Sequence, residues 1–124
     1  MEINCIVDKL KKENTQMVKN KSYIEENIRK YINELKKYVT IKMVILYGSW
    51  ANGNPDEYSD IDLAVFSPDF GKHKLKELQL LSKLAWGIDE SIEAIPFSDR
   101  RLTENDPTSF CSHIIKTGEV IESL

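Results

Sequence analysis

The chain of 124 residues has the length of one domain, and 41% hydrophobic with 30% charged residues is a globular composition. A net charge of −3 argues against a protein that coats nucleic acid, because such proteins are usually basic overall. Two cysteines cannot form a disulfide framework, and no apolar run approaches the ~18 residues that span a bilayer, so we expect a cytoplasmic protein without a membrane segment.

Charge is unevenly distributed along the sequence. Residues 1–42 carry ten Lys or Arg against six Asp or Glu, a balance of +4, whereas residues 43–124 carry seven against fourteen, a balance of −7. We expect most of the N-terminal lysines on solvated helix faces; the alternative is that some of them meet phosphates or an acidic partner.

The first residues predict a helical arm. Apolar residues recur at helical spacing over 2–12, which predicts a short amphipathic helix. Residues 13–21 are polar and weakly patterned, so they form either a linker or a continuation of that helix. We therefore divide the chain into an arm, residues 1–21, and a domain, residues 22–124.

The domain is expected to begin with a capped helix. Ser22 and Glu25 have the spacing of a capping box, in which the hydroxyl accepts a hydrogen bond from a backbone N–H and the carboxylate reaches back. Apolar residues behind it keep to one stripe and predict a helix over about 23–38. A β-rich apolar run over 41–47, stopped by Gly48, predicts a buried strand.

The remaining apolar stretches alternate between strand and helix patterns after a loop rich in turn residues, 52–56. This order predicts an α/β fold in which one small mixed β-sheet is covered by helices. In chain order, we expect a strand over 61–66, a helix over 72–86 ended by Gly87, a strand over 91–97, a helix opened by Asp106 and Pro107 and stopped by Gly118, and a short edge strand at 120–121.

Two acids on the second strand are the first candidates for chemistry. Residues two apart on a strand point to the same side, so Asp60 and Asp62 should share one face while Ile61 and Leu63 share the other. Two carboxylates desolvated beside each other are unfavourable unless a cation lies between them. Hard carboxylate oxygens without a nearby His or Cys favour Mg²⁺ or Mn²⁺ over zinc, so the pair predicts such an ion.

Gly48 and Ser49 predict an anion site. A strand that ends in Gly-Ser and turns into a helical stretch directs backbone N–H groups and a hydroxyl to whatever lies above the turn, and phosphates bind readily there. Together with the two acids, this turn predicts a site for a metal-bound triphosphate, and therefore phosphoryl or nucleotidyl transfer.

These residues also carry a family resemblance. Gly48-Ser49-x-Ala51-x-Gly53, followed by Ser59-Asp60-Ile61-Asp62-Leu63, resembles the signature of the DNA polymerase beta-like nucleotidyltransferases. Within that superfamily it is most similar to the minimal nucleotidyltransferases, which are small stand-alone prokaryotic domains. The resemblance covers about residues 41–97. It implies a mixed sheet in which the Gly48–Ser49 turn, with Gly53 and Ser59 of the same motif, binds the nucleotide, and in which Asp60 and Asp62 hold two Mg²⁺ ions.

The family resemblance further implies a third carboxylate on a neighbouring strand. Asp89 and Glu90 precede the third strand, whereas Glu93 is an isolated charge between Ile92 and Ala94, and we choose Glu93 as catalytic and metal-binding. The alternative is an exposed strand face on which Glu93 only meets solvent. The family often has Asp here, so the longer Glu side chain bears on metal geometry or rate.

The resemblance implies an enzyme that moves a nucleoside monophosphate, AMP from ATP, onto an acceptor hydroxyl and releases pyrophosphate. Ser49 and the turn would hold the β and γ phosphates, and Glu93 would receive the acceptor's proton. A second hypothesis is an interaction module, because small proteins of this family resemble antitoxins whose partner is an all-helical HEPN-type ribonuclease. The arm would then be a docking or homodimer surface, or pack on its own domain. A third is a non-catalytic relative, which a Glu93 pointing away from the two aspartates would favour.

Other prominent side chains are expected to be structural. We expect Trp50, Leu81 and Trp86 to pack in the core, because large apolar groups after such turns and on helix stripes usually do; the alternative for Trp50 is stacking on a base or a partner. We expect surface salt bridges for Arg100 and Arg101, with a phosphate contact as the alternative.

Overall fold

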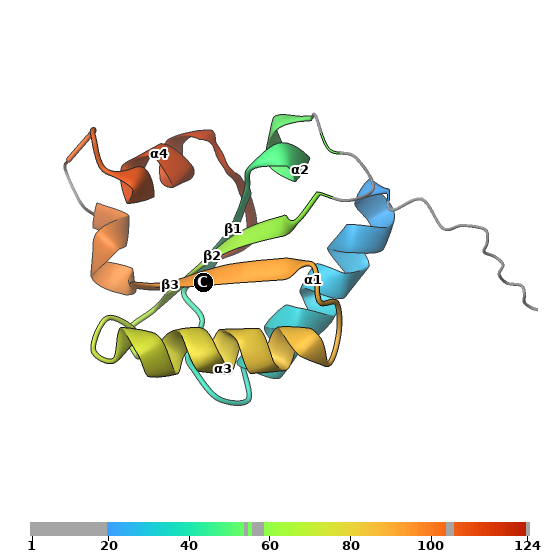
Figure 1. Cartoon of the computed structure of the whole chain (residues 1–124). Coiled ribbons are helices and arrows are strands. Elements are labelled where there is room, and N and C mark those ends of the chain that lie inside the picture. The colour runs from blue at the N-terminus through green and yellow to red at the C-terminus, as the bar shows by residue number, and fades with distance from the viewer. Residues whose placement is uncertain (1–19, 54, 56–58, 104–105, 124) are drawn as a thin grey trace, which may run out of the picture.

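A four-stranded mixed sheet runs through the middle of the molecule, as Figure 1 shows. The computed structural model describes residues 20–53, 55, 59–103 and 106–123. The strands follow the order β3-β2-β1-β4; β1 is antiparallel to both of its neighbours, and β2 is parallel to β3. Their bounds are β1 (Met43–Tyr47), β2 (Ile61–Ser67), β3 (Ile92–Ser98) and β4 (Glu119–Ser123). The prediction of an α/β fold with one small mixed sheet is confirmed, and the predicted edge strand at 120–121 is part of β4.

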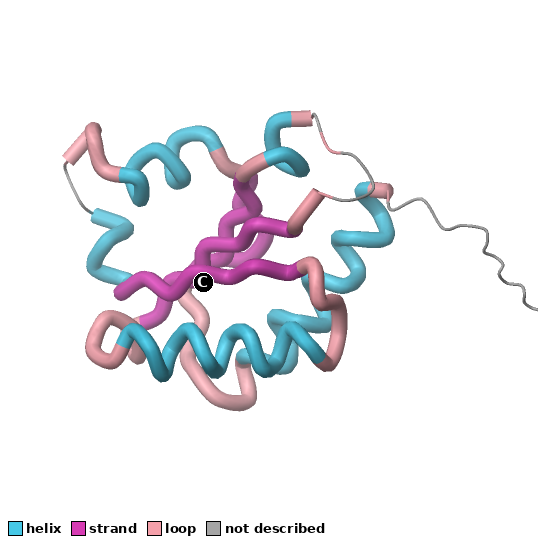
Figure 2. The backbone as a smooth tube through the Cα atoms, in the orientation of Figure 1, coloured by secondary structure: helices cyan, strands magenta, loops and turns pink. Residues whose placement is uncertain are grey.

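Helices lie on both faces of this sheet, and the tube in Figure 2 separates them from the strands by colour. Helices α1 and α3 cover one face, and α4 covers part of the other. None of the described helices is long and apolar enough to cross a membrane. The helical elements are α1 (Lys21–Leu35), α2 (Ser49–Asn52), α3 (Lys74–Trp86), the 3-10 turn η1 (Asp99–Thr103) and α4 (Phe110–Thr117).

The larger core lies between the sheet and the helices α1 and α3. Leu63 of β2 packs in one buried cluster with Ile28 of α1 and Leu81 of α3. The buried hydroxyl of Tyr31 donates a hydrogen bond of 2.7 Å to the backbone oxygen of Leu81, which ties the two helices together. Each fully buried Leu or Ile contributes about 1.5–3 kcal/mol, so this face holds most of the stability of the domain.

The smaller core lies on the other face, under α4. It joins Ile45, Ala64 and Phe66 of the sheet to Cys111 and Ile114 of α4. Because α4 has only eight residues, it covers the sheet over a short distance. The acids on this face are accordingly exposed or half-buried rather than enclosed.

The predicted cap of the first helix is wrong. Asn20 is the N-cap, and its side chain accepts a hydrogen bond of 2.9 Å from the backbone N–H of Tyr23. Asn is as good an N-cap as Ser, and it comes two residues earlier, so Ser22 and Glu25 lie inside the helix instead of forming a capping box. The arm predicted over 1–21 lies outside the described residues, apart from its last two.

The predicted start of the last helix is also wrong. Ser109 is the N-cap of α4, and its hydroxyl accepts a hydrogen bond of 3.0 Å from the backbone N–H of Ser112. Asp106 instead accepts hydrogen bonds from the backbone and hydroxyl of Thr108, at 3.0 and 2.6 Å, and so closes a separate turn before the helix. The predicted stop at Gly118 is confirmed, because α4 ends at Thr117 and Gly118 is its C-cap. A Cβ at Gly118 would lie within 3 Å of backbone oxygens of β1 and α4, so glycine fits this position.

Two of the three expected core side chains are buried. Trp50 is 6% exposed and Leu81 is buried in the larger core. Trp86 is 70% exposed, so its predicted place in the core is wrong. It is the last residue of α3, where the buried stripe formed by Leu81 and Ala85 has already turned away from it.

Candidate functional site

Three strands bring polar side chains to one edge of the sheet. Tyr47 at the end of β1 lies opposite Asp62 of β2, and Asp62 lies opposite Glu93 of β3. Since β1 is antiparallel to β2 and β3 is parallel to it, the end of β1 and the starts of β2 and β3 meet at this edge, beside α2 in Figure 1. Residues far apart in the sequence thus become neighbours here.

The three predicted acids come together at this edge. Ile61 and Leu63 are buried in the larger core, so Asp62 faces the α4 side of the sheet. The charge of Asp60, the residue before β2, raises the pKa of Glu93, so the two carboxyl groups lie close together. Glu93 therefore points toward the aspartates, which counts against the interpretation that it only meets solvent.

Crowding contributes to raised pKa values at Asp62 and Glu93. Burial raises the pKa of Asp62 to about 6, and the charges of Glu93 and Asp60 add to the effect. The charge of Asp60 raises the pKa of Glu93, with burial and the hydrogen bond between them as further causes. Like charges held together without a cation disfavour ionisation, and these shifts are the expected result.

The two rejected acids have other surroundings. Asp89 accepts hydrogen bonds from the side chain of Asn27, at 3.1 Å, and from the backbone and hydroxyl of Ser91, at 2.9 and 2.6 Å. It therefore holds the turn before β3 in place. Glu90 is exposed and precedes β3.

Gly48 allows the turn after β1 to touch the acids. It has φ +76° and caps the short helix α2, and a Cβ at this position would collide with Oδ2 of Asp62. Only glycine fits both the backbone conformation and this close approach. The carboxylate of Asp62 thus lies against the backbone of the turn, next to exposed Ser49.

The other two predicted binding residues flank this turn. Gly53 ends α2 with φ +80°, and its N–H bonds to the backbone oxygen of Ser49. The backbone oxygen of Ser59 accepts a hydrogen bond of 3.4 Å from the indole N–H of buried Trp50. Trp50 therefore ties the segment that leads into β2 to the helix that follows β1.

Tyr47 and Phe110 belong to the same region, although the sequence patterns did not single them out. Their rings meet edge to face at 5.8 Å, and both line a hollow of about 200 Å³ that adjoins Gly48, with Asn52 and His113 among its other lining residues. Burial raises the pKa of Tyr47 to about 12, and the charges of Asp62 and Glu93 contribute. The sequence could have placed Tyr47 at this site, because it precedes Gly48 on a predicted strand. No sequence pattern indicated that Phe110 would lie there.

The carboxylate oxygens of Asp60, Asp62 and Glu93 are of the kind that divalent cations such as Mg²⁺ take as ligands. Among the described residues, no three His, Cys, Asp or Glu side chains form by themselves a set that could hold a metal ion. Mg²⁺, however, commonly takes one or two carboxylates and completes its shell with water and substrate phosphates. The mutual repulsion of Asp60, Asp62 and Glu93 is what such a cation would relieve. These residues therefore fit an ion that arrives with a phosphate ligand.

Comparisons with known proteins find both a family model and relatives that resemble this chain. The family model for polymerase beta nucleotidyltransferases matches residues 26–123. Over 100 residues, the chain is 33% identical to "Putative protein adenylyltransferase MJ0604" of Methanocaldococcus jannaschii, and the match covers 78% of this chain and 96% of that protein.

Two solved structures have a similar fold. One is a "putative nucleotidyltransferase" of Sulfolobus solfataricus, with a TM-score of 0.56, 19% identity, and coverage of 85% of this chain and 90% of that one. The other is a toxin-antitoxin structure with AMP-PNP, with a TM-score of 0.55, 22% identity, and coverage of 81% and 73%. At these identities the likeness is one of fold.

Proposed function

This chain belongs to the polymerase beta nucleotidyltransferase family, and from that premise we propose that it transfers AMP from ATP to a hydroxyl of a protein. The observation that carries the proposal is the meeting of Asp60, Asp62 and Glu93 beside the turn at Gly48. The similarity to a protein named as a protein adenylyltransferase supports a protein as the acceptor.

The turn would hold the phosphates of ATP. Gly48 and Ser49 would receive the β and γ phosphates, with Gly53 and Ser59 shaping the flanks of the turn. The contact between the backbone of Gly48 and the carboxylate of Asp62 supports this role, because one ligand can then meet the turn and the acids together. The hollow between Tyr47 and Phe110 opens beside the same turn and has room for part of the nucleoside.

Asp60 and Asp62 would hold Mg²⁺ or Mn²⁺, with Glu93 as a third ligand. When bound, the ion supplies positive charge that offsets the charge of the triphosphate and of the transition state. The position of Asp62 between Glu93 and the turn supports its role as the central ligand. Among the described residues, no Lys or Arg forms an ion pair with either aspartate, so the pair is suited to hold the cation that ATP brings.

Glu93 would take the proton of the acceptor. As the acceptor oxygen attacks the α phosphorus, a new O–P bond forms, the bond to the β-phosphate oxygen breaks, and pyrophosphate leaves with its electron pair. Glu93 is exposed, so a hydroxyl of another protein can approach it. Its raised pKa supports the role, because a base works best when its pKa lies nearer the working pH.

The test uses ATP labelled at either the α or the γ phosphate, with Mg²⁺ and a cell extract as the source of acceptors. We expect α label, but no γ label, to become attached to protein, because AMP transfer retains only the α phosphate. Asp60→Asn should lower the labelling about 100-fold or more. Labelling from γ-labelled ATP, or full labelling by Asp60→Asn, would contradict the proposal.

A second candidate function is that of an antitoxin that binds a HEPN-type ribonuclease and transfers AMP to it. The shared fold with a toxin-antitoxin structure that contains AMP-PNP favours this candidate. The test is co-expression with a small helical protein that carries an R-x₄-H motif and is encoded in the adjacent reading frame. Rescue of growth by the wild type alone would indicate catalysis, rescue also by Asp60→Asn would indicate binding alone, and no rescue would contradict both.

A further inference from the structure

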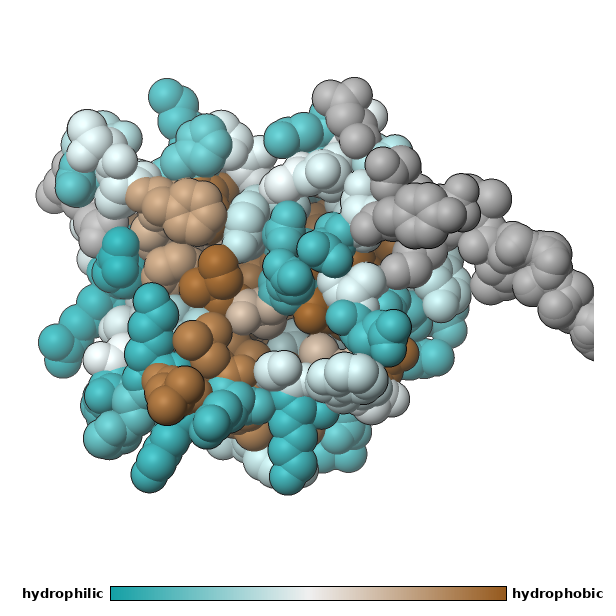
Figure 3. All heavy atoms as spheres, viewed as in Figure 1, coloured by the Kyte–Doolittle hydropathy of each residue, from teal (hydrophilic) through white to brown (hydrophobic). Residues whose placement is uncertain are grey.

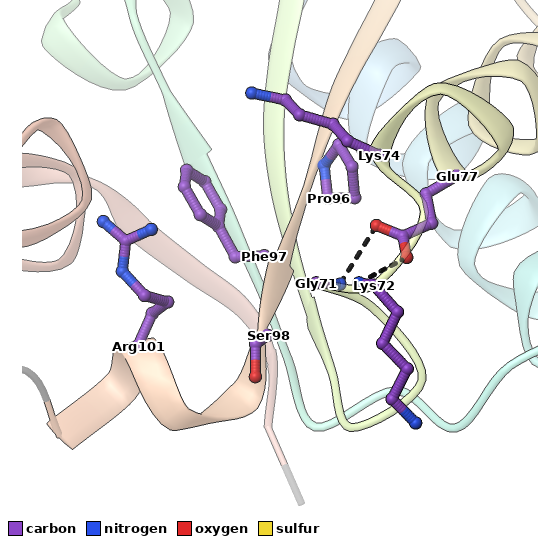
Figure 4. Close-up of a pocket in the computed structure, with 8 residues that line it drawn as sticks. All are labelled: Gly71, Lys72, Lys74, Glu77, Pro96, Phe97, Ser98 and Arg101. Atoms are coloured by element: carbon purple, nitrogen blue, oxygen red, sulfur yellow. Dashed lines mark hydrogen bonds between the residues drawn. The ribbon is translucent and has the colours of Figure 1, made fainter.

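A second hollow lies at the other end of the sheet from the acids. Its volume is about 340 Å³, and Figure 4 shows the residues that line it. Pro96 and Phe97 of β3 lie between Lys74 on one side and Arg101 of η1 on the other, and Lys72 extends from the loop before α3. We call this feature the basic hollow.

The basic hollow gathers positive charge in an otherwise acidic part of the chain. Five of the seven Lys and Arg residues in 43–124 lie in the two segments 72–76 and 100–101. In the part of the chain that the structure describes, neither Lys72 nor Lys74 forms an ion pair. Two cations are thus available to an incoming acid, beside an arginine held in place.

Of the described residues that line the basic hollow, Glu77 is the only acid, and it already has partners. The carboxylate of Glu77 accepts hydrogen bonds from the backbone N–H groups of Gly71, Lys72 and His73, at 3.0, 3.1 and 2.9 Å. Because these donors compensate its charge, Glu77 does not need the lysine side chains. An anionic ligand would therefore meet a net positive surface.

Phe97 helps to decide between two kinds of anionic partner. Its ring stacks on Phe66, with centroids 5.2 Å apart, and the guanidinium of Arg101 lies 5.4 Å from its centroid. Nucleic-acid sites of this kind usually offer aromatic rings on which bases can stack. This ring is already occupied by Phe66 and Arg101, so the hollow favours carboxylates of a protein over a nucleic acid.

The basic hollow and Glu93 share one strand, β3. Glu93 and Phe97 are four residues apart on β3, which places them about 13 Å apart on the same face. Apolar groups are exposed nearby: Leu75 at the start of α3 is 70% exposed, and Figure 3 shows apolar side chains over β3 and this part of α3, with hydrophilic groups around them. A partner helix of about nine residues would span this distance.

We propose that the basic hollow binds an acidic segment of a partner protein. Lys72, Lys74 and Arg101 would meet its carboxylates, and its apolar side chains would lie against Pro96 and Leu75. The inference rests on the proposed function for the identity of the partner, which would be the protein that accepts AMP. Held at one end of β3, that protein could present a hydroxyl to Glu93 at the other.

The test is a titration of the full chain with a fluorescein-labelled peptide rich in glutamate, followed by fluorescence anisotropy. We expect saturable binding that weakens with salt and is absent for the matched peptide in which glutamine replaces glutamate. The double variant Lys72→Gln, Lys74→Gln should bind about tenfold more weakly. The charge-matched control Lys83→Gln, Lys116→Gln, with both positions exposed and outside the hollow, should bind as the wild type does.

The inference is overturned if the glutamate peptide does not bind saturably, or if the glutamine peptide binds equally well. It is also overturned if the Lys72→Gln, Lys74→Gln variant binds as the wild type does, if both double variants lose binding equally, or if a short single-stranded DNA binds more tightly than the glutamate peptide. The last result would assign the hollow to nucleic acid. Each outcome of the titration supports or overturns the inference without ATP or metal, so its result does not depend on whether the protein transfers AMP.

The AMP-transfer assay can show that the docking inference fails while the proposed function stands. With a protein acceptor that becomes labelled, Lys72→Gln, Lys74→Gln should raise the KM for that acceptor about tenfold and leave the KM for ATP unchanged. If labelling proceeds with an unchanged KM for the acceptor, the proposed function stands and the docking inference fails.

Discussion

Carboxylates near the two ends of β3 have pKa values shifted in opposite directions. Near its start, Glu93 lies with Asp60 and Asp62, and burial together with the charges of the neighbouring acids raises the pKa of Asp62 and of Glu93. Near its other end, burial tends to raise the pKa of Glu77, but three backbone N–H donors outweigh burial and hold that pKa below its ordinary value. A carboxylate with backbone donors is part of the scaffold, whereas crowded carboxylates without a counter-charge are suited to a ligand that brings one.

The same contrast applies to the cations. Lys21 and Lys36 form ion pairs of 2.9 Å with Glu119 and Glu122, which link α1 to β4. Lys72 and Lys74 have no such partner among the described residues. Charges that the fold leaves uncompensated, at either end of β3, are therefore the best guide to ligands in this protein. Each prediction below tests one side of this comparison.

Among the variants that follow, Glu93→Gln should have the largest effect. Glu93→Gln keeps the shape of the side chain but cannot accept a proton, so kcat for AMP transfer should fall about 100-fold. The matched variant Glu90→Gln, three residues away and exposed, should keep the wild-type rate. Steady-state kinetics with α-labelled ATP measures both. Equal rates for the two variants would remove Glu93 from the mechanism.

Gly48→Ala should damage both fold and activity. The added Cβ collides with Asp62 and meets a φ of +76°, so we expect a loss of about 1–3 kcal/mol in the free energy of unfolding. Urea unfolding measures this loss. Gly53→Ala is the control, because Gly53 has a similar φ but a Cβ added there would meet no atom within 4 Å, and it should lose less. Equal losses would show that backbone strain alone matters at this turn.

Glu77→Gln, near the other end of β3, should lower the free energy of unfolding by about 1–2 kcal/mol at neutral pH. A neutral amide is a weaker acceptor than a carboxylate for the three backbone N–H groups. The pKa of Glu77 is lowered in the folded state, so its contribution is full above the unfolded value of about 4.3. As the pH falls through the lower folded-state pKa, the contribution is lost and the two proteins should converge. Urea unfolding of both proteins across this pH range measures the difference in their free energies of unfolding. A difference that stays constant as the pH falls would contradict the prediction.

The smallest effect should come from Phe110. Phe110 is 55% exposed beside the hollow at Gly48, and Phe110→Ala should raise the KM for ATP about fivefold with little change in kcat, since one aromatic contact contributes about 1 kcal/mol. Tyr38→Ala, an exposed aromatic outside this hollow, is the control. An unchanged KM in Phe110→Ala would place the nucleoside elsewhere.

Much of the fold and half of the site could be predicted from short-range patterns. The alternation of Asp60 and Asp62 with Ile61 and Leu63 follows from the period of a strand, and the turn at Gly48 follows from glycine's access to positive φ. The N-cap residues of α1 and α4 could not be predicted, because each helix has two suitable candidates only a few residues apart. They are Asn20 and Ser22 for α1, and Asp106 and Ser109 for α4.

Local sequence settles which elements form, which face of each strand is apolar, and where a glycine turn follows β1, because these depend on neighbours within a few residues. The packing of distant segments settles the rest. The parallel register of β2 and β3 sets Glu93 opposite Asp62, α4 brings Phe110 to Tyr47, and η1 brings Arg101 to the lysines before and within α3. No local pattern encodes these meetings, because each is fixed by the burial of two separate cores on either side of one sheet.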